Sequence, residues 1–463
     1  MSNCKFYKKQ QEVKYPGSDD WIPTGQYEKG NLIEEDSPDC GYTPPTPSGY
    51  ADQYYTIITT NSGTSLQFFG SSAGTTANTS IQYSTDSGIT WSYLASGSTI
   101  SNLDANTKVM FKGTLTPIAN KGIGTIYVSS GYDDSLYIEG NPMSLLFGDN
   151  FRGQYSLDGK SYAFYNLVSD AISCANLVLP ATILSKSCYE RMFTGSGQMI
   201  HPPSVLPALT LVQDCYKEMF RGCRLKNAPQ IMAVTMATNC CSGMFEGCTL
   251  TIPPQLPSTT LAPYCYNDMF RDCRRLTTTP EFPATTMATG CYQYMFNGCT
   301  NLTGTTTLPA TTLANFCYYG MFEGCTSLTT VPSNMLPATT LTTQCYEYMF
   351  KDCVSLITAP QLPSTTLEYM CYNGMFKNCT SLTSAPVLSA PKLKSHCYYE
   401  MFTGCDSLNY IKCLATDKTA YNCTYDWVDG VAQNGTFAKA ISATWSRGTA
   451  GVPDNWTIQD STS

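Results

Sequence analysis

A nine-residue pattern of apolar positions recurs along much of the chain. In CYEYMFKDC, which runs from Cys345 to Cys353, apolar and aromatic residues occupy positions 0, 1, 4, 5 and 8 counted from the first cysteine, and variable residues stand between them. On a helix these positions fall within an arc of about 140°. The pattern therefore predicts a short amphipathic helix whose Cys, Tyr, Met and Phe side chains face a core.

The pattern occurs in nine copies with a period close to 26 residues, and the copies begin at Cys188, Cys215, Cys240, Cys265, Cys291, Cys317, Cys345, Cys371 and Cys397. A period of this length is typical of a solenoid, in which each unit buries its apolar face against its neighbours. We predict a structural core ladder of Cys317, Met321, Phe322, Cys325, Cys345, Met349, Phe350, Cys353, Cys371, Met375, Phe376 and Cys379.

The residues around each predicted helix supply start and stop signals. Position 7 is Gly, Asp or Asn in every copy, as at Gly324 and Asp352, and these residues tolerate a left-handed helix C-cap. Between helices, alternating Leu and Thr from Thr326 to Pro332 predict a short strand. The Leu-Pro-Ala-Thr-Thr-Leu that follows predicts a turn, with Thr340 or its neighbour as the N-cap of the next helix.

The chain has 23 cysteines, and 17 of them occupy position 0 or 8 of a copy. Zinc sites favour cysteines two to four residues apart or joined by histidine, whereas the spacing here is eight and the two histidines are His201 and His396. A disulfide within a copy would need Cα atoms within about 7 Å, which eight helical residues exceed. A disulfide between equivalent cysteines of adjacent turns stays geometrically open. We predict that these cysteines pack as small buried hydrophobes and that the chain binds no metal or cofactor.

The repeat resembles the BspA-like leucine-rich repeats of Bacteroides and related gut and oral bacteria. The resemblance rests on the pattern CYxxMFxGCTSLTxxPxLPATTLxxx and covers about Cys174 to Cys413. It implies an adhesive surface without catalytic residues. The copies depart from the pattern at Cys241, at Ser196 and from Met232 to Thr238.

Residues 1–42 form a distinct N-terminal segment, which we interpret as a small β module for docking; the alternative is a loose N-terminal arm. The stretch from Tyr27 to Gly41 resembles a leader of virion proteins in Bacteroides phages, including the crAss-like group. The resemblance implies that other virion proteins are partners of this module. Residues 43–49, TPPTPSG, predict a proline-rich linker.

Residues 50–149 alternate apolar and polar positions in short runs separated by turn residues, which predicts an immunoglobulin- or fibronectin-like β-sandwich. The string STDSGITW matches an Asp-box pattern through Ser84, Asp86, Gly88 and Trp91. This pattern is common in sialidases. We interpret it as a hairpin with the Trp packed beneath the turn, because no pair of carboxylates suited to glycoside hydrolysis stands out. The sequence therefore predicts no enzyme activity.

The repeat period stops at Ile411. Residues 413–463 hold Trp427, Trp445 and Trp456, which we interpret as the core of a small C-terminal cap, with a carbohydrate platform as the alternative. The predicted fold is a multidomain, β-rich chain with an N-terminal β module, a β-sandwich, an α/β leucine-rich-repeat solenoid at 150–412 with about nine 26-residue repeats, and this cap.

The net charge of −8 argues against a nucleic-acid partner, because neutralising phosphates requires clustered Lys and Arg. No apolar run reaches the roughly 20 residues of a membrane span, so we expect no membrane partner. The start, MSNCKFYKKQQEVKYPG, lacks the apolar segment of a secretory signal. We therefore expect a phage virion protein made in the host cytoplasm, fibre-like or appended to the head or tail. A BspA-like bacterial cell-surface adhesin and a purely structural capsid or tail decoration are the alternatives.

Positions 2, 3 and 6 of the copies form the predicted ligand-binding surface. A ridge of tyrosines suits stacking on glycans and contacts with proteins, so we expect a host cell-surface protein or glycan as partner. Packing against neighbouring chains is the alternative, and a homo-oligomer stays open because no heptad pattern decides it. The candidate ligand-binding residues are Tyr294, Tyr319, Tyr348, Tyr399, Arg271 and Lys351.

Overall fold

The chain divides into two units, Met1–Thr46 and Pro47–Ser463. The structure is a computed structural model, and it describes residues 10–14, 21–27, 49–73, 76–128 and 136–461. In the first unit it describes strands β1 (Gln10–Lys14) and β2 (Trp21–Tyr27), which pair antiparallel. The rest of the predicted docking module and most of the predicted linker lie outside the described residues.

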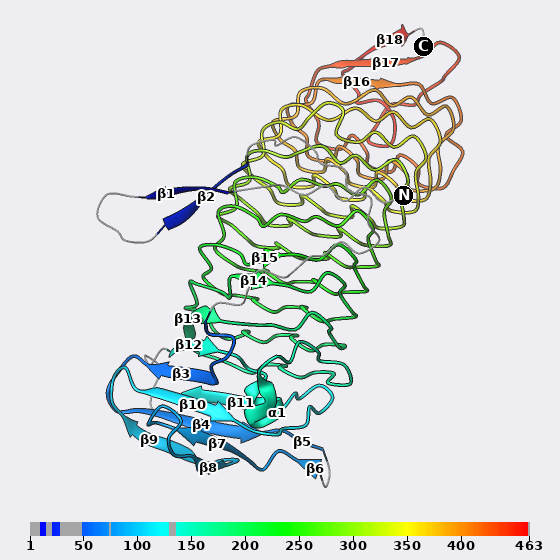
Figure 1. The fold of residues 1–463 in the computed structure, drawn as a ribbon. Helices are drawn as coiled ribbons and strands as arrows, with labels where there is room; N and C mark the ends of the chain where they lie inside the picture. Colours follow the sequence, from blue (N-terminus) through cyan, green and yellow to red (C-terminus); the bar gives the residue numbers. More distant parts are fainter. Residues whose placement is uncertain (1–9, 15–20, 28–48, 74–75, 129–135, 462–463) are drawn as a thin grey trace. The chain divides into compact units, whose positions relative to one another are not determined.

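The second unit begins with two sheets whose buried residues belong to one hydrophobic core (Figure 1). The larger sheet has the order β13-β12-β3-β10-β7-β8 and the smaller one β11-β4-β9. Ile57 and Val109 of the larger sheet share this core with Leu66, Phe68 and Ile126 of the smaller sheet. The strands are β3 (Tyr55–Thr59), β4 (Thr64–Gly70), β7 (Ser80–Ser84), β8 (Ser92–Ala95), β9 (Thr99–Leu103), β10 (Lys108–Lys112), β11 (Gly124–Val128) and β12 (Leu136–Gly140), with a small pair β5 (Ser72–Ala73) and β6 (Thr76–Ala77) beside them.

The larger sheet continues directly into the repeats. Strand β12 pairs antiparallel with β3 on one side and parallel with β13 (Ala171–Leu177) on the other. A parallel bridge from Ser173 to His201 then links β13 to the following coil. Helix α1 (Ser144–Phe147) and the 3₁₀ helix η1 (Gly148–Phe151) precede this junction. The apolar end of the solenoid is thus covered by the sandwich, as repeat folds require.

The repeats consist of turns, so the predicted helices, and with them the α/β character of the solenoid, are wrong. Among the described residues, α1 and η1 are the only helical elements, and no described helix is long and apolar enough to cross a membrane. Within and just before the string CYEYMFKDC, Gln344, Tyr348 and Asp352 have φ values of 56°, 54° and 60°. A helix requires φ near −60° at every residue, so a positive value at every fourth residue excludes it.

The backbone hydrogen bonds of each coil alternate between two kinds of partner. The N–H groups of Tyr346, Tyr348 and Phe350 donate to carbonyl oxygens of the next coil at 2.9–3.1 Å. Those of Met349 and Lys351 donate to the residue three positions earlier in the same coil, at 3.3 and 3.1 Å. Every fourth residue takes the turn position that needs positive φ. Each coil is therefore a series of tight turns. It also pairs with its neighbouring coils through backbone hydrogen bonds, as a strand does in a parallel sheet.

A period of four explains why the sequence pattern was misread. Turns that repeat every four residues place positions 0, 1, 4, 5 and 8 on the inner side, and a helix with 3.6 residues per turn does the same over two turns. The left-handed conformation expected at position 7 is present at Gly324, with φ of 75°. It recurs at position 3 in the same coil, at Gly320 with φ of 56°, where a helix interior would exclude it.

The segments between these turn runs pair only locally. The predicted strand from Thr326 to Pro332 is not a strand. Single parallel bridges join neighbouring coils instead, as between Thr358 and Ser384. Thr340 bridges to Thr366 and caps no helix. The two strands assigned in the early coils are β14 (Val205–Leu206) and β15 (Gln230–Ile231), which pair parallel.

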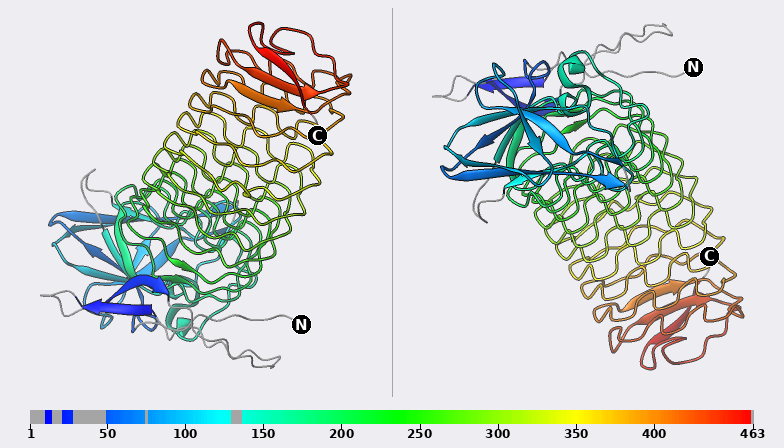
Figure 2. Two further views of the ribbon diagram at one scale, coloured as in Figure 1. Left: turned by 90° about the horizontal axis from the view of Figure 1, so that it is seen from above. Right: turned by 90° about the horizontal axis from the view of Figure 1, so that it is seen from below.

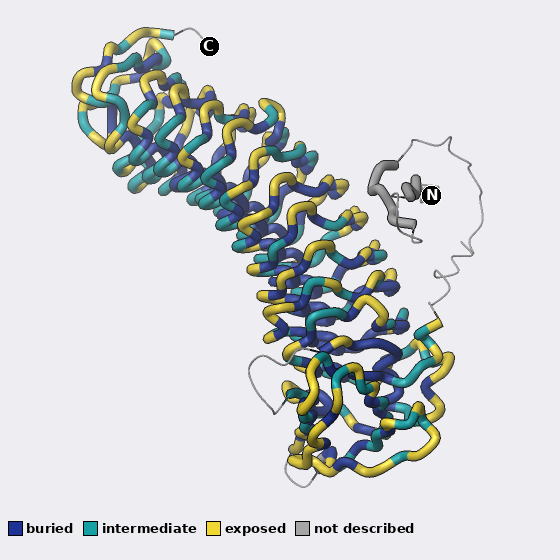
Figure 3. Tube along the Cα trace, turned by 90° about the vertical axis from the view of Figure 1, so that its left-hand side faces the viewer, coloured by how far each residue is buried: buried dark blue, intermediate teal, exposed yellow. Residues whose placement is uncertain are grey.

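Buried residues recur in every coil as columns of equivalent side chains, and Figure 3 colours their backbone dark blue. All twelve residues of the predicted core ladder are fully buried. Rings of one column stack on their equivalents in the next coil, with centroids 5.7 Å apart for Tyr318 and Tyr346 and 5.7 Å for Phe322 and Phe350. Each buried Phe or Met side chain contributes about 1.5–3 kcal/mol to stability, so these columns hold the solenoid together.

The ladder extends beyond the nine predicted copies at both ends. The N–H of Phe164 donates to the carbonyl of Cys188 at 2.7 Å, and that of Glu400 donates to the carbonyl of Tyr425 at 2.9 Å. The prediction that the repeat stops at Ile411 is therefore wrong for the backbone geometry. The coil after Ile411 was missed because Thr424, Trp427 and Val428 stand where other copies have Tyr, Met and Phe.

The C-terminal end of the coil stack carries a parallel sheet. It is formed by β16 (Tyr410–Cys413), β17 (Thr436–Ala440) and β18 (Thr457–Ser461). Figure 2 shows these strands at the opposite end of the stack from the β-sandwich. Trp427 and Trp456 are buried beneath this sheet region, and Trp445 stacks on Trp427 with centroids 5.5 Å apart. The tryptophans therefore form a core and not an exposed platform.

We predict that Gly374→Ala destabilises the solenoid and that Gly304→Ala does not. Gly374 has φ of 54°, and an added Cβ would lie 2.4 Å from the Tyr348 ring, whereas a Cβ on Gly304 would meet nothing within 4 Å. The left-handed conformation alone costs an alanine about 1–2 kcal/mol, and displacing the tyrosine adds to it. Thermal unfolding of both variants measures the difference. Equal midpoints would contradict the turn geometry.

Candidate functional site

Positions 2, 3 and 6 of the coils lie outside the buried columns, and we call the surface that they form the variable face. Its residues change from coil to coil, from Arg191 and Glu218 in early coils to Tyr399 and Glu400 in late ones. The parallel ladder brings equivalent positions of adjacent coils to about 4.8 Å, the spacing of paired strands. Side chains of neighbouring coils therefore contact one another along this face.

Three of the predicted ligand-binding tyrosines form one row on the variable face. The Tyr294 and Tyr319 rings meet edge to face with centroids 5.1 Å apart, and those of Tyr319 and Tyr348 meet at 5.8 Å. All three side chains are half-buried. Burial raises the pKa of each phenol, most strongly that of Tyr319. The row is a semi-exposed aromatic strip whose hydroxyl groups stay protonated at neutral pH.

Glycines in the following coils make room for this row. A Cβ on Gly320 would lie 2.5 Å from the Tyr294 ring, and one on Gly374 would lie 2.4 Å from the Tyr348 ring. The same relation holds for Gly290 and Tyr264, at 2.3 Å. Each of these tyrosines thus packs over the bare backbone of a glycine in the next coil, which fixes the position of its ring.

The two predicted cations, Arg271 and Lys351, lie beside the tyrosine row. The Arg271 guanidinium is 5.8 Å from the Tyr294 centroid, and the Lys351 ammonium is 5.2 Å from that of Tyr348. Lys351 also forms an ion pair with Glu323 at 2.7 Å. Arg271 is paired with two aspartates, Asp268 at 3.5 Å and Asp272 at 4.0 Å. The cations therefore support the row and are already engaged with protein carboxylates.

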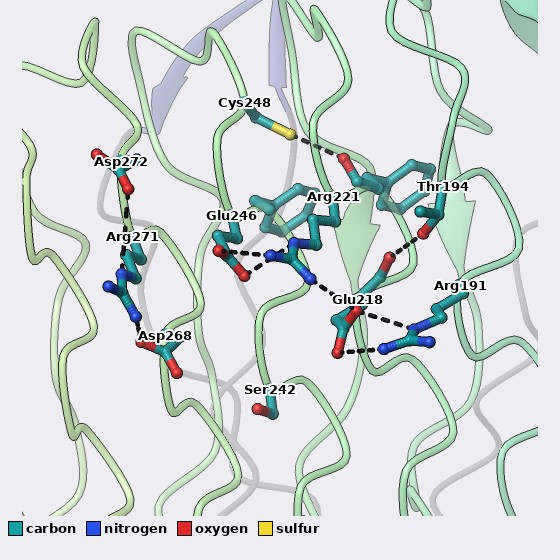
Figure 4. A network of polar contacts seen from close by, with 12 residues as sticks. Arg191, Thr194, Glu218, Arg221, Ser242, Glu246, Cys248, Asp268, Arg271 and Asp272 are labelled. Carbon is teal, nitrogen blue, oxygen red and sulfur yellow. Dashed lines mark hydrogen bonds and ion pairs between the residues drawn. The ribbon is translucent and has the colours of Figure 1, made fainter.

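The early coils carry a chain of ion pairs in the equivalent place (Figure 4). Arg191 pairs with Glu218 at 2.9 Å, and Arg221 pairs with Glu218 at 3.2 Å and with Glu246 at 3.1 Å. Burial alone would raise the pKa of Glu218, but Arg191 and Arg221 outweigh it and hold that pKa below its ordinary value. The variable face is thus charged in its early coils and aromatic in later ones.

Two glutamates of the variable face are buried, Glu190 and Glu347, and Glu347 is the more deeply buried of them. Glu347 accepts hydrogen bonds from the amide groups of Gln344 at 2.6 Å and Asn373 at 2.7 Å. Burial raises the pKa of Glu347 to about 7, although both hydrogen bonds favour the ionised form. The other amide atom of Asn373, Oδ1, is buried without a partner. Ionising Glu347 therefore costs the folded state free energy.

The fourth predicted tyrosine, Tyr399, is not part of the row. Its ring stacks on Tyr425 with centroids 5.0 Å apart and lies 5.4 Å from the His396 ring. Tyr425 and His396 thus belong to an aromatic cluster that the repeat pattern does not predict. Tyr425 occupies position 2 of the coil that begins at Cys423, so recognising that degenerate coil in the sequence would have revealed it.

The position-8 cysteines have a regular hydrogen-bond partner. The thiols of Cys325, Cys353 and Cys379 each lie 3.1–3.2 Å from the carbonyl oxygen of the position-5 phenylalanine in the preceding coil. All 21 cysteines of the described residues are free and buried. Among those residues no group of three or more His, Cys, Asp and Glu could hold a metal ion. The thiols thus fill space as small side chains and satisfy a carbonyl lone pair.

The Asp-box residues form the hairpin between β7 and β8. The Asp86 carboxylate accepts hydrogen bonds from the Ser84 hydroxyl at 2.6 Å and from the Thr90 hydroxyl at 2.6 Å. These bonds, that from Ser84 first, lower the pKa of Asp86 to about 2. Gly88 has φ of 86° at the turn and accepts a hydrogen bond from the Trp91 indole at 3.1 Å.

Trp91 connects the hairpin to the rest of the sandwich. The Lys112 ammonium lies 4.1 Å from its ring centroid, and the Tyr54 ring meets it edge-on at 4.9 Å. Tyr54 and Lys112 both bond to the Asp149 carboxylate, at 2.6 and 2.9 Å. The Asp149 carboxylate, which is the only one in this group besides Asp86, is thus bonded to its neighbours. These contacts hold the hairpin against the rest of the sandwich.

We predict that Glu347→Gln makes stability less dependent on pH. The folded pKa near 7 lies above the ordinary value of 4.5, so the folded state loses stability as pH rises through this window. The loss approaches about 3 kcal/mol above pH 7, because the pKa of Glu347 is raised by about 2.5 units and each unit corresponds to about 1.36 kcal/mol. The variant should therefore unfold at a higher temperature than the natural chain at pH 8 and at nearly the same temperature at pH 4. Glu281→Gln, at an exposed position, is the control, and identical pH profiles for all three proteins would refute the prediction.

We predict that iodoacetamide at pH 8 leaves the ladder thiols of the folded protein unmodified. Burial blocks access and raises the pKa of Cys223, Cys273 and Cys405 to about 12, so the reactive thiolate is scarce. Peptide mapping before and after denaturation measures the modification, which should be complete only in the denatured sample. Alkylation of position-8 cysteines in the folded sample would show that the columns open.

Comparisons with known proteins support the repeat assignment. Residues 213–333 and 289–427 match the family described as "BspA type Leucine rich repeat region (6 copies)". A crystal structure of a leucine-rich repeat protein from Bacteroides ovatus ATCC 8483 aligns at 13% identity over 76% of this chain and 95% of that chain, with a TM-score of 0.23, which is too low to carry an argument. A search of curated protein sequences found no match. The predicted resemblance to BspA-like repeats is thus confirmed over residues 213–427, and that of the N-terminal leader to phage proteins stays a prediction.

Proposed function

We propose that this chain is a non-enzymatic attachment protein that presents the variable face of its solenoid to a host surface. The observation that carries the proposal is the separation of the core from this face. The buried columns repeat nearly unchanged, while positions 2, 3 and 6 change from coil to coil. Such a scaffold can vary its binding residues without disturbing its fold, because each coil contacts only its neighbours.

The arrangement of polar groups supports binding over catalysis. Several charged residues of the variable face form ion pairs between adjacent coils, such as Lys351 with Glu323 and Arg221 with Glu246. The thiols are buried, and burial raises the pKa of Cys223, Cys273 and Cys405, which disfavours nucleophilic chemistry. A semi-exposed row of Tyr294, Tyr319 and Tyr348 suits contacts with a protein or a glycan, because tyrosine offers a large rigid surface with a polar tip.

We further propose that the protein is carried on a phage virion, as a fibre-like component or an appendage of the head or tail. The N-terminal module would bind other virion proteins, and the solenoid would contact a host cell-surface protein or glycan, including mucus. The resemblance of residues 27–41 to leaders of Bacteroides phage proteins supports this assignment.

A bacterial cell-surface adhesin is the second candidate. It is favoured by the match of residues 213–427 to the BspA-type family, because that family suggests a surface or adhesin-type repeat protein. A purely structural decoration of the capsid or tail is the third candidate and would bind no ligand through the variable face.

We predict that peptides of this chain occur at stoichiometric levels in density-purified phage particles. Peptide mass spectrometry on those particles and, separately, on the bacterial envelope makes the comparison. Peptides found only in the envelope would contradict the virion assignment and support the adhesin.

Deleting residues 150–463 distinguishes the attachment function from a purely structural decoration. Particles that assemble without the solenoid but no longer infect support the attachment function. Particles that assemble and infect normally would overturn it in favour of a decoration.

A further inference from the structure

A cluster of exposed and partly buried aromatic rings lies on the last coils of the solenoid. We call it the C-terminal aromatic patch, and it consists of Tyr369, His396, Tyr399, Tyr421 and Tyr425. The His396 ring is central, with centroid distances of 5.7 Å to Tyr369, 5.4 Å to Tyr399 and 5.3 Å to Tyr421. Tyr425 stacks on Tyr399 at 5.0 Å with an angle of 14° between the planes. Three consecutive coils therefore contribute rings to one surface.

The patch is not part of the solenoid core. The core tyrosines occupy position 1, as Tyr372 and Tyr398 do, and are almost fully buried. In contrast, Tyr421 is 73% exposed, and Tyr425 and Tyr369 are 44% and 42% exposed. The position of Tyr369 and Tyr421, two residues before the first cysteine, holds polar or small residues in most copies, such as Thr343 and Ser395. These rings are therefore dispensable for folding, and their exposure calls for another explanation.

Two carboxylates lie beside the patch, and the Ser395 hydroxyl forms a hydrogen bond with the His396 ring at 2.8 Å. Glu400 follows Tyr399 and is paired with Lys377, and Asp426 follows Tyr425 and accepts a hydrogen bond from Thr449 at 2.8 Å. The negative charge of Asp426 acts directly on the patch, because it is the largest cause of the raised pKa of the Tyr425 phenol. An anionic ligand would be repelled here, whereas an uncharged ligand with hydroxyl groups could donate hydrogen bonds to these carboxylates.

The size and chemistry of the patch favour a sugar over a protein partner. A specific protein interface needs about 800 Å² from each partner, and five partly exposed rings supply only part of that area. A sugar ring has an apolar face and an edge of hydroxyl groups. Tyrosine offers a flat apolar ring and a polar hydroxyl group, so the two can stack and form hydrogen bonds at the same time.

We propose that the C-terminal aromatic patch binds a neutral oligosaccharide, with sugar rings stacked on Tyr421 and Tyr425 and hydroxyl groups directed to Glu400 and Asp426. This inference rests on the proposed attachment function and names the class of its partner. It also shifts the contact from the predicted row at Tyr294 to the end of the solenoid.

The test uses the full chain and arrays of neutral glucose-, galactose-, mannose- and N-acetylglucosamine-containing oligosaccharides beside their sialylated and sulfated counterparts. The natural chain should bind at least one neutral oligosaccharide, and its acidic counterpart more weakly. The double variant Tyr421→Ala and Tyr425→Ala should lose roughly tenfold or more in affinity. Tyr93→Ala is the matched control, because Tyr93 is 75% exposed on β8, and its affinity should be unchanged.

Folding of the variants is checked by thermal unfolding, and Tyr421→Phe gives a second comparison that keeps the ring. It should retain most of the affinity if stacking dominates. Absence of binding to every neutral oligosaccharide, or equal affinity of the double variant and the natural chain, would overturn the inference. If cells are still bound by the natural chain in that case, the attachment function stands without this site. If neither sugars nor cells are bound, both proposals fail together.

Discussion

Each coil of this solenoid is joined to the next by every second backbone amide of its turn runs, and the rest of the structure depends on this ladder. The bonds to the next coil alternate with bonds that close turns within the coil, as at Tyr348 and Met349. Almost every buried N–H of the coil is thereby satisfied without a helix or an extended strand. The cost is a positive φ at every fourth residue, which falls on Tyr348 and Asp352 as well as on glycines.

The ladder also explains the choice of core residues. Because equivalent residues of adjacent coils are about 4.8 Å apart, any inward side chain lies against a copy of itself. Flat Tyr and Phe rings tolerate this by stacking, and the Phe350 and Phe376 planes differ by only 5°. Cysteine suits position 8 because it is small and can place its thiol against a carbonyl, as Cys405 does on Phe376 at 3.0 Å. A β-branched or larger side chain would not fit beside the turn backbone in the same way.

The sequence predicted burial better than it predicted backbone conformation. The inward positions were identifiable because a helix and a four-residue turn place the same residues on one side, and Met349 and Phe350 are buried on either interpretation. The difference lay in the outward positions, where Gly320 and Gly374 at position 3 are poor helix residues and suited to positive φ. Contacts between coils could not be predicted, because no single copy of the repeat shows that Tyr348 packs on Gly374. The cluster at His396 depends on the coil at Cys423, whose core residues no longer match the pattern.

The same ladder limits how freely the variable face can change. A tyrosine ring at position 3 lies over the backbone of the next coil, where a glycine leaves room for it, whereas Arg191 and Glu218 at the same position are both large and form an ion pair instead. Tyr294 is followed by Gly320, and Tyr348 by Gly374. Asp272 and Gly298 show the same relation at position 7, where a Cβ would lie 2.8 Å from the aspartate oxygen. Substitutions are therefore coupled in pairs along the solenoid axis where a tyrosine of one coil packs on a glycine of the next, so exchanging Tyr348 requires the space above Gly374 to be filled again.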